Sequence, residues 1–178
     1  MDEKEIDSGT FGAMKGVAVQ KFVAVIGNRN SGKSTVIRSL TGCPNSAFRG
    51  EVKDNTTGES IHVICSSPQE RPLTLQELRR ILKACAANRK CRGLVMAIQP
   101  TSPTKRLSME TIFQEIASLG SFQSHAFMLA PGRVGGSPNT AAIVTRLKSL
   151  KLKPITLDGG RFAMLNAQVI NKRTHIAG

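Results

Sequence analysis

Phe22-Val23-Ala24-Val25-Ile26, followed directly by Gly27-Asn28-Arg29-Asn30-Ser31-Gly32-Lys33-Ser34-Thr35, is the stretch that decides the fold. The first part is an unbroken apolar run rich in branched side chains, which predicts a strand buried on both faces. The residues from Gly27 to Ser34 fit the pattern G-x-x-x-x-G-K-[ST], and apolar residues at helical spacing then continue to a stop at Gly42. Strand, glycine loop and helix therefore follow in the order that a phosphate-binding loop requires.

The residue types in this loop suit a bound triphosphate. Gly27 and Gly32 let backbone amides approach an anion closely, and the positive end of the following helix dipole favours negative charge there. Lys33 is expected to bridge the β- and γ-phosphates, and the Ser34 hydroxyl is expected to bind Mg²⁺. We therefore predict nucleotide-binding roles for all residues from Gly27 to Thr35. The alternative is a glycine turn with a purely structural role in an α/β sheet.

Length and composition set the frame for this loop. At 178 residues the chain can form one domain with a full core, which we place at 20–178 after a loose acidic leader at 1–19. No apolar run approaches the ~18 residues of a membrane span, and the acidic N-terminus does not fit a secretory signal. The four cysteines have no C-x-x-C spacing. We expect a cytoplasmic protein with free thiols and no zinc.

The charge of the chain is strongly basic. Twenty-five Lys and Arg residues stand against 12 Asp and Glu, for a net charge of +13. Such a balance favours a polyanionic partner, either nucleic acid or an acidic protein surface. Two clusters are candidates for contacts with that partner. The first consists of Arg79, Arg80 and Lys83 with Arg89, Lys90 and Arg92 just beyond them, and the second of Lys148, Lys151 and Lys153. The alternative is plain solvation, because a chain with no Tyr or Trp offers little for stacking against bases.

Apolar strands and amphipathic helices alternate along the chain. Strands are expected at 22–26, 61–65, 93–98, 126–130 and 154–157, with helices at 36–41, 75–85, 112–119 and 137–150 between them. The stretch 47–60 is polar, and 163–170 fits a helix or a strand equally well. This alternation predicts an α/β fold of the P-loop NTPase type, with a doubly wound, mainly parallel sheet of about five strands and helices on both faces.

The segment from Phe22 to Gly58 resembles the opening of the Era-like translation-factor class of P-loop GTPases. The resemblance rests on the run Ile26 to Thr35, on Leu40-Thr41-Gly42, and on Thr56-Thr57-Gly58 ahead of a strand. In that class a threonine ahead of a strand coordinates Mg²⁺ when the γ-phosphate is present. The resemblance implies this metal-binding role for Thr57, or for Thr56. The alternative is that these residues form a simple polar turn.

Two further motifs of that class are missing. D-x-x-G should follow the strand at 61–65, where this chain has Ser66-Ser67-Pro68-Gln69-Glu70. N-K-x-D, which reads guanine, should follow the strand at 126–130, where this chain has Pro131-Gly132-Arg133-Val134. Guanine specificity is therefore unsupported, and the nucleotide is predicted only as ATP or GTP.

Acidic residues at the carboxyl ends of strands are the remaining catalytic candidates, because ligands bind at that edge of a parallel sheet. Glu70 is predicted to orient a water or to hold the metal through a water, the alternative being a surface glutamate. Asp158 is expected to cap a turn with Gly159. Gln69 is a candidate to position a water, and Arg133 is a candidate to contact the nucleotide.

These patterns together predict a Mg²⁺-dependent protein that binds a purine nucleoside triphosphate and acts as a slow NTPase or a nucleotide switch. One alternative is a binding module that keeps the phosphate loop, lacks turnover and serves a protein or nucleic-acid partner. Another alternative is a small P-loop phosphotransferase.

Overall fold

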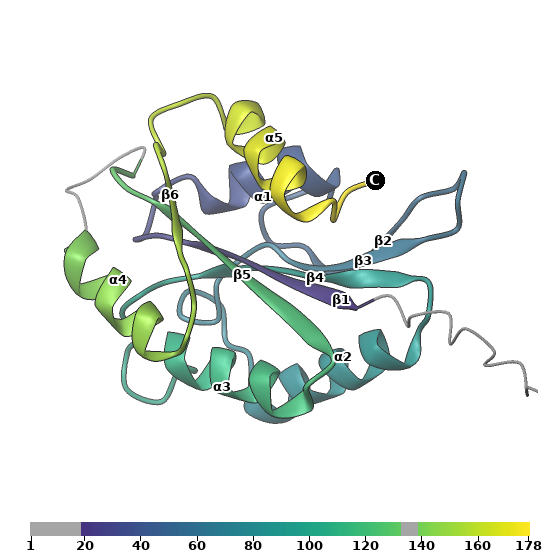
Figure 1. The fold of residues 1–178 in the computed structure, drawn as a ribbon, viewed down its shortest axis with the longest axis horizontal. Coiled ribbons are helices and arrows are strands. Elements are labelled where there is room, and N and C mark those ends of the chain that lie inside the picture. The colour runs from purple at the N-terminus through teal and green to yellow at the C-terminus, as the bar shows by residue number, and fades with distance from the viewer. Residues whose placement is uncertain (1–18, 133–138) are drawn as a thin grey trace, which may run out of the picture.

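The computed structural model describes residues 19–132 and 139–178, and within them a six-stranded sheet lies between two layers of helices (Figure 1). The leader expected at 1–19 lies outside the described residues except for Val19, and so do Arg133 and the expected helix start at 137. In chain order the elements are β1 Gln20–Ile26, α1 Lys33–Thr41, β2 Arg49–Lys53, β3 Ser60–Ile64, α2 Leu75–Ala87, β4 Cys91–Ile98, α3 Met109–Leu119, β5 Phe122–Leu129, α4 Thr140–Ser149, β6 Ile155–Leu157 and α5 Ala163–Thr174.

The sheet has the strand order β2-β3-β4-β1-β5-β6. All neighbours pair in parallel except β2 and β3, which form an antiparallel hairpin at one edge. The predicted class is confirmed: this is an α/β fold, doubly wound and mainly parallel. The strand count exceeds the prediction by the edge strand β2.

Strand β1 lies at the centre of the sheet and is buried on both faces. Phe22, Ala24 and Ile26 pack into the core beneath α2, α3 and α4, whereas Val23 and Val25 pack against α1 and α5. Figure 1 shows the same division, with α1 and α5 on one side of the sheet and the other helices on the opposite side. The unbroken apolar run in the sequence reflects this double burial.

The helices begin and end at residues suited to those positions. The spacing Thr74-x-x-Glu77 in the sequence predicts a capping box, and the structure has it at the start of α2. Gly42 ends α1 and Gly120 ends α3, each with a left-handed backbone conformation. The undecided stretch at 163–170 belongs to the helix α5. None of the helices in the described part of the chain has the length and apolarity needed to cross a membrane.

Strand β2 is the element that the sequence did not reveal. Its residues, Arg49 to Lys53, are all half-buried or exposed and include only one large apolar side chain, Val52. Charged side chains are common on edge strands, where they discourage pairing with another chain, so such a strand gives little apolar signal. The polar stretch 47–60 therefore contains the strand β2, and the turn at 54–59 joins β2 to β3.

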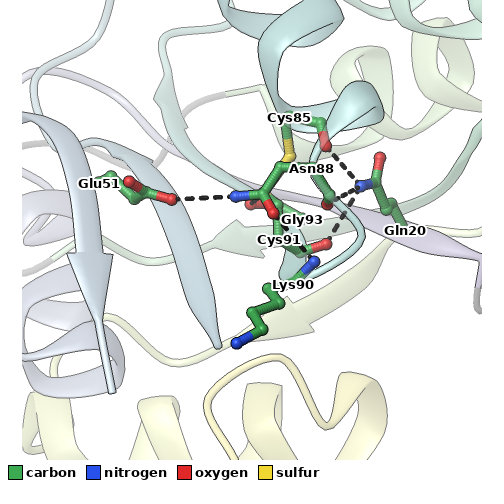
Figure 2. Close-up of a disulfide and its surroundings, with 7 residues drawn as sticks. All are labelled: Gln20, Glu51, Cys85, Asn88, Lys90, Cys91 and Gly93. Carbon is green, nitrogen blue, oxygen red and sulfur yellow. Dashed lines mark hydrogen bonds between the residues drawn. A yellow bond between two sulfur atoms is a disulfide. The ribbon is translucent and has the colours of Figure 1, made fainter. Parts of the chain in front are cut away.

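The expectation of four free thiols is wrong for two of the cysteines. Cys85, near the end of α2, and Cys91, at the start of β4, form a disulfide, whereas Cys43 and Cys65 are free and buried. Figure 2 shows the Gln20 amide beside this bond, with Nε2 at 2.6 Å from the Cys85 carbonyl oxygen and 3.1 Å from that of Cys91. Disulfides persist in oxidising surroundings, so this one lends no support to the expected cytoplasmic location, which stays a prediction.

We expect the double variant Cys85→Ser, Cys91→Ser to be less stable by about 2 kcal/mol, because a cross-link over a short loop removes that much freedom from the unfolded chain. Urea unfolding of the oxidised protein and of the variant measures the difference. A reducing agent should lower the stability of the parent protein to that of the variant and leave the variant unchanged. Equal stability of the oxidised and reduced parent would contradict a stabilising role for the bond.

Candidate functional site

The loops that follow the parallel strands gather at one edge of the sheet. The loop 27–32 follows β1, and the backbone amide of Gly27 donates to the carbonyl of Ile98, the last residue of β4, at 3.0 Å. The helix after β1 lies on one face of the sheet and the helices after β4 and β5 on the other, so the loop lies where the chain changes faces (Figure 1). In open α/β sheets this point is where ligands bind.

The phosphate-loop sequence folds here into the tight turn that its glycines predict. A Cβ atom on Gly27 would lie 2.4 Å from Ser31 Oγ, so no larger residue fits at that position without moving the loop. Gly32 has φ 95°, in the left-handed region, and ends the loop as the N-cap of α1. The amide of Ser31 donates to the carbonyl of Asn28 at 3.2 Å. The loop therefore closes on itself and leads directly into the first turn of the helix.

Lys33 is the first residue of α1 and is buried, with 3% of its side chain exposed. Its Nζ donates to the carbonyl of Asn28 at 2.7 Å and lies 3.9 Å from Glu70 Oε1. Burial lowers the pKa of the Lys33 ammonium from 10.5 to about 8, and the Glu70 carboxylate offsets part of that effect. The first turn of α1 contains no acidic residue. A buried cation thus stands at the positive end of a helix dipole with one carboxylate at ion-pair distance.

Ser34 links the start of α1 to the end of β3. Its hydroxyl donates to the carbonyl of Cys65 at 2.9 Å. Burial raises the pKa of the Cys65 thiol to about 12, so this cysteine stays a neutral thiol. The proton of the Ser34 hydroxyl is used in the bond to Cys65, and the lone pairs of its oxygen remain for a ligand.

Glu70 is held beside Lys33 by a residue that the sequence did not single out. Gln99, directly after β4, donates from Nε2 to Glu70 Oε1 at 2.7 Å. The same residue donates from its backbone amide to Gln69 Oε1 at 3.0 Å, while Gln69 Nε2 donates to the carbonyl of Leu107 at 2.6 Å. Glu70 and Lys33, the two predicted catalytic residues, are therefore brought together in the structure.

The same contacts correct the suggestion that Gln69 positions a water. Its side chain is buried, and both ends of its amide bond to backbone groups of the loop after β4. Gln69 is a brace between two loops. In the sequence, Gln69 could be recognised only by its position after a strand. Gln99, which follows β4, belongs to no motif, so its contact with Gln69 was not predicted.

Thr57, which the resemblance to the Era-like class assigned to the metal, lies at the wrong end of the sheet. It is exposed in the turn between β2 and β3, where its hydroxyl donates to Asp54 Oδ2 at 2.8 Å. The five residues of β3 separate that turn from the loop bearing Glu70, a span of roughly 17 Å. Figure 1 shows this turn far from the start of α1. The sequence did not reveal β2, so it did not show that Thr57 lies in the turn of the β2–β3 hairpin, away from the phosphate loop.

Two further sequence assignments concern the loops after β5 and β6. Asp158 caps a turn as expected, since its Oδ1 accepts from the amide of Gly160 at 2.8 Å. Its Oδ2 lies 3.9 Å from Arg161 Nε in an exposed pair. Arg133, proposed to contact the nucleotide, lies outside the described residues.

The residues around Lys33 suit a Mg²⁺–triphosphate. The Ser31 hydroxyl is buried in the loop and has no hydrogen-bond partner within residues 19–132 and 139–178, and the same holds for the hydroxyls of Ser66 and Ser67 in the loop after β3. Within the described residues, no group of three or more His, Cys, Asp or Glu side chains gathers into a metal site. Mg²⁺ commonly binds to one or two protein oxygens together with waters and phosphate oxygens, and Ser34 and Glu70 provide that kind of donor set.

Comparison of the chain with protein-family models finds no match. Comparison with curated proteins likewise finds none. Among solved structures, the chain is similar to the FeoB G-domain from Methanococcus jannaschii, with 19% sequence identity, a TM-score of 0.45, and coverage of 87% of this chain and 97% of that one. A likeness at that level is too weak to transfer a fold or a function to this chain.

Removal of the buried charge of Lys33 should stabilise the protein. We expect Lys33→Met to be more stable than the parent at pH 7 by roughly 3 kcal/mol, since the pKa falls from 10.5 to about 8 and each pKa unit corresponds to about 1.4 kcal/mol. Below pH 8 both the folded and the unfolded parent keep this proton. Between pH 8 and 10.5 only the unfolded state keeps it, so the stability of the parent rises with pH and the gap closes.

Denaturant unfolding at several pH values measures that gap. Lys83→Met, which removes an exposed lysine from α2, is the matched control and should show neither effect. A gap independent of pH would mean that the burial of Lys33 costs the fold nothing.

Proposed function

We propose that the protein binds a purine nucleoside triphosphate with Mg²⁺ through the loop 27–35, and that it hydrolyses the nucleotide slowly or uses it as a switch. Gly27, Asn28, Arg29, Asn30, Ser31, Gly32, Lys33, Ser34 and Thr35 would surround the phosphates. The part of the Era-like resemblance that this proposal retains is the phosphate loop itself. ATP and GTP are both candidates, because no residue of the described chain has been identified that would read guanine.

The observation that carries the proposal is the burial of Lys33 at the N-terminus of α1. A cation at that end of a helix is opposed by the helix dipole, and a nearly dry environment adds a desolvation cost. The single neighbouring carboxylate is 3.9 Å away and does not restore the pKa of Lys33 to its ordinary value. A polyphosphate in the loop would supply the missing negative charge and would accept hydrogen bonds from the amides of the first turn.

Mg²⁺ would be held by Ser34 Oγ and by phosphate oxygens, with Glu70 acting directly or through a water. When bound, the ion would neutralise charge on the phosphates and so favour phosphoryl transfer. The carboxylate of Glu70, fixed by Gln99 at 2.7 Å, is the group best placed to orient an attacking water. Thr57 has no part in this proposal, since the turn that holds it precedes β3, whereas the loop with Glu70 follows that strand.

The basic surface supports a second part of the proposal, a nucleic-acid or acidic protein partner. Arg80, Lys83 and Lys90 are exposed on or beside α2, whereas Arg79 is paired with Glu115 at 2.7 Å. A partner of this kind would account for the net charge of +13, which the proposed nucleotide site alone does not require. A binding module without turnover and a small phosphotransferase remain the competing functions, and the two measurements below separate them from an NTPase.

The triphosphate prediction tests the loop directly. Lys33→Met should weaken binding of the β,γ-imido analogue of ATP by at least tenfold and should affect AMP far less, because Lys33 is expected to contact the β- and γ-phosphates. Isothermal titration calorimetry with Mg²⁺ gives both affinities. Lys83→Met removes the same charge far from the loop and should bind like the parent. Unchanged affinity of Lys33→Met for the triphosphate analogue would refute the proposed site.

The turnover prediction tests Glu70. We expect the parent to release phosphate well below once per minute, comparable to an unassisted GTPase at roughly 10⁻⁴ per second. Glu70→Gln should lower that residual rate by about tenfold or more while the affinity for the imido analogue stays within about twofold, since an orienting base acts mainly in the transition state.

Gln99→Ala should lower the hydrolysis rate as Glu70→Gln does, because it removes the hydrogen bond that fixes the Glu70 carboxylate. Glu51→Gln removes an exposed carboxylate from β2 and serves as the control. Phosphate release is measured with and without RNA at low salt. Turnover of several per second by the protein alone, unaffected by Glu70→Gln, would show that other groups perform the reaction.

A further inference from the structure

A hollow of about 680 Å³ opens beside the phosphate loop, between α1 and the loop that connects β6 to α5. Gly32, Thr35 and Ser39 line it on the side of α1, and Arg161, Phe162 and Met164 line it on the side of α5. We call it the α1–α5 pocket. Its volume lies within the range of 300–1,000 Å³ that is usual for small-molecule sites.

The α1–α5 pocket is built against the phosphate loop. A Cβ atom on Gly159 would lie 2.6 Å from the carbonyl oxygen of Pro131 and 3.1 Å from that of Ser31, so the connection after β6 touches the phosphate loop directly. The amide of Gly159 donates to the same Pro131 oxygen at 2.9 Å. Gly32 and Thr35 belong both to the phosphate loop and to the pocket wall. A molecule anchored by its phosphates in the loop can therefore extend into this pocket.

Phe162 is the unusual residue of the pocket wall. Its side chain is 81% exposed, whereas Phe22, Phe113 and Phe127 are buried in the cores. It also occupies the N-cap position of α5, where a phenyl ring offers no acceptor for the free backbone amides. Nothing in the fold or in the start of the helix explains an aromatic side chain at this position.

We propose that the ring of Phe162 is the platform on which the base of the bound nucleotide stacks, with Met164 extending the same apolar surface. This inference rests on the proposed function, because the base reaches the pocket only when its phosphates occupy the loop. Among the described residues that line the pocket there is no carboxylate, and Arg161 is the only charged one. A base held by stacking is recognised by its flat shape, so adenine and guanine are both accepted.

The first experiment separates the base from the phosphates. Phe162→Ala should weaken binding of the imido analogues of ATP and GTP by roughly tenfold, a typical loss for one stacked base, and should leave binding of inorganic tripolyphosphate unchanged. Val169→Ala, which truncates another exposed apolar residue of α5 outside the pocket, is the matched control. Phe162→Tyr should bind like the parent.

The second experiment uses the absence of Trp and Tyr from the sequence. Phe162→Trp introduces a single tryptophan at the proposed platform, and its fluorescence should be quenched by either nucleotide analogue but not by tripolyphosphate. This variant also keeps an aromatic surface, so its affinity for nucleotide should remain close to that of the parent.

The outcomes distinguish this inference from the function on which it depends. If Phe162→Ala binds the analogues like the parent while Lys33→Met does not bind them, the stacking platform is wrong and the phosphate loop stands. Equal weakening of tripolyphosphate and nucleotide by Phe162→Ala also overturns the platform, because the ring would then act on the loop. If the parent binds neither ligand, both proposals fail.

Discussion

The burial of the Lys33 ammonium at the start of α1 is the constraint on which the candidate site depends. The side chain is 3% exposed, its first helical turn has no acid, and its pKa falls to about 8. Such an arrangement persists only because the surrounding structure fixes it. Strand β1 is buried on both faces, and the loop 27–32 has no room for a larger residue at Gly27. Helix α1 packs against α5 on the face of the sheet that holds Val23 and Val25.

The strand order explains how the remaining polar groups reach Lys33. Because β4 lies between β3 and β1, the loops after β3 and β4 are neighbours at the same edge of the sheet. Gln69, Glu70 and Gln99 are consequently joined into one network. Lys33 and Ser34 both contact the segment after β3, through Glu70 and Cys65. On the proposed function, a bound Mg²⁺–triphosphate would contact Lys33 and Ser34 as well. Nucleotide binding would therefore compete with the contacts that hold the segment after β3.

The sequence predicted those parts of the molecule whose signals are local. The phosphate loop, the capping box at Thr74 and the stop at Gly42 each depend on residues within a few positions of one another, and the structure has all three. The role of Gln99 depends on β4 being the neighbour of β3, a pairing that no local pattern encodes. Thr57 was misplaced for a related reason, since a polar edge strand hides the point at which the hairpin turns. The Cys85–Cys91 bond likewise depends on how the chain turns from α2 into β4.

The N-termini of the helices give a separate argument that the α1–α5 pocket is a site. Helices α2, α3 and α4 begin with side-chain caps from Thr74, Ser108 and Asn139. Helices α1 and α5, which form the two walls of the pocket, begin at Gly32 and Phe162 with no side-chain cap. A missing cap costs about 1 kcal/mol of stability. Because three other helices of this chain are capped, the absence of caps at α1 and α5 calls for a local explanation. Residues that break local sequence preferences are typical of functional sites when they lie close together. Here both uncapped helix starts line the α1–α5 pocket, next to the loop that leads to Lys33.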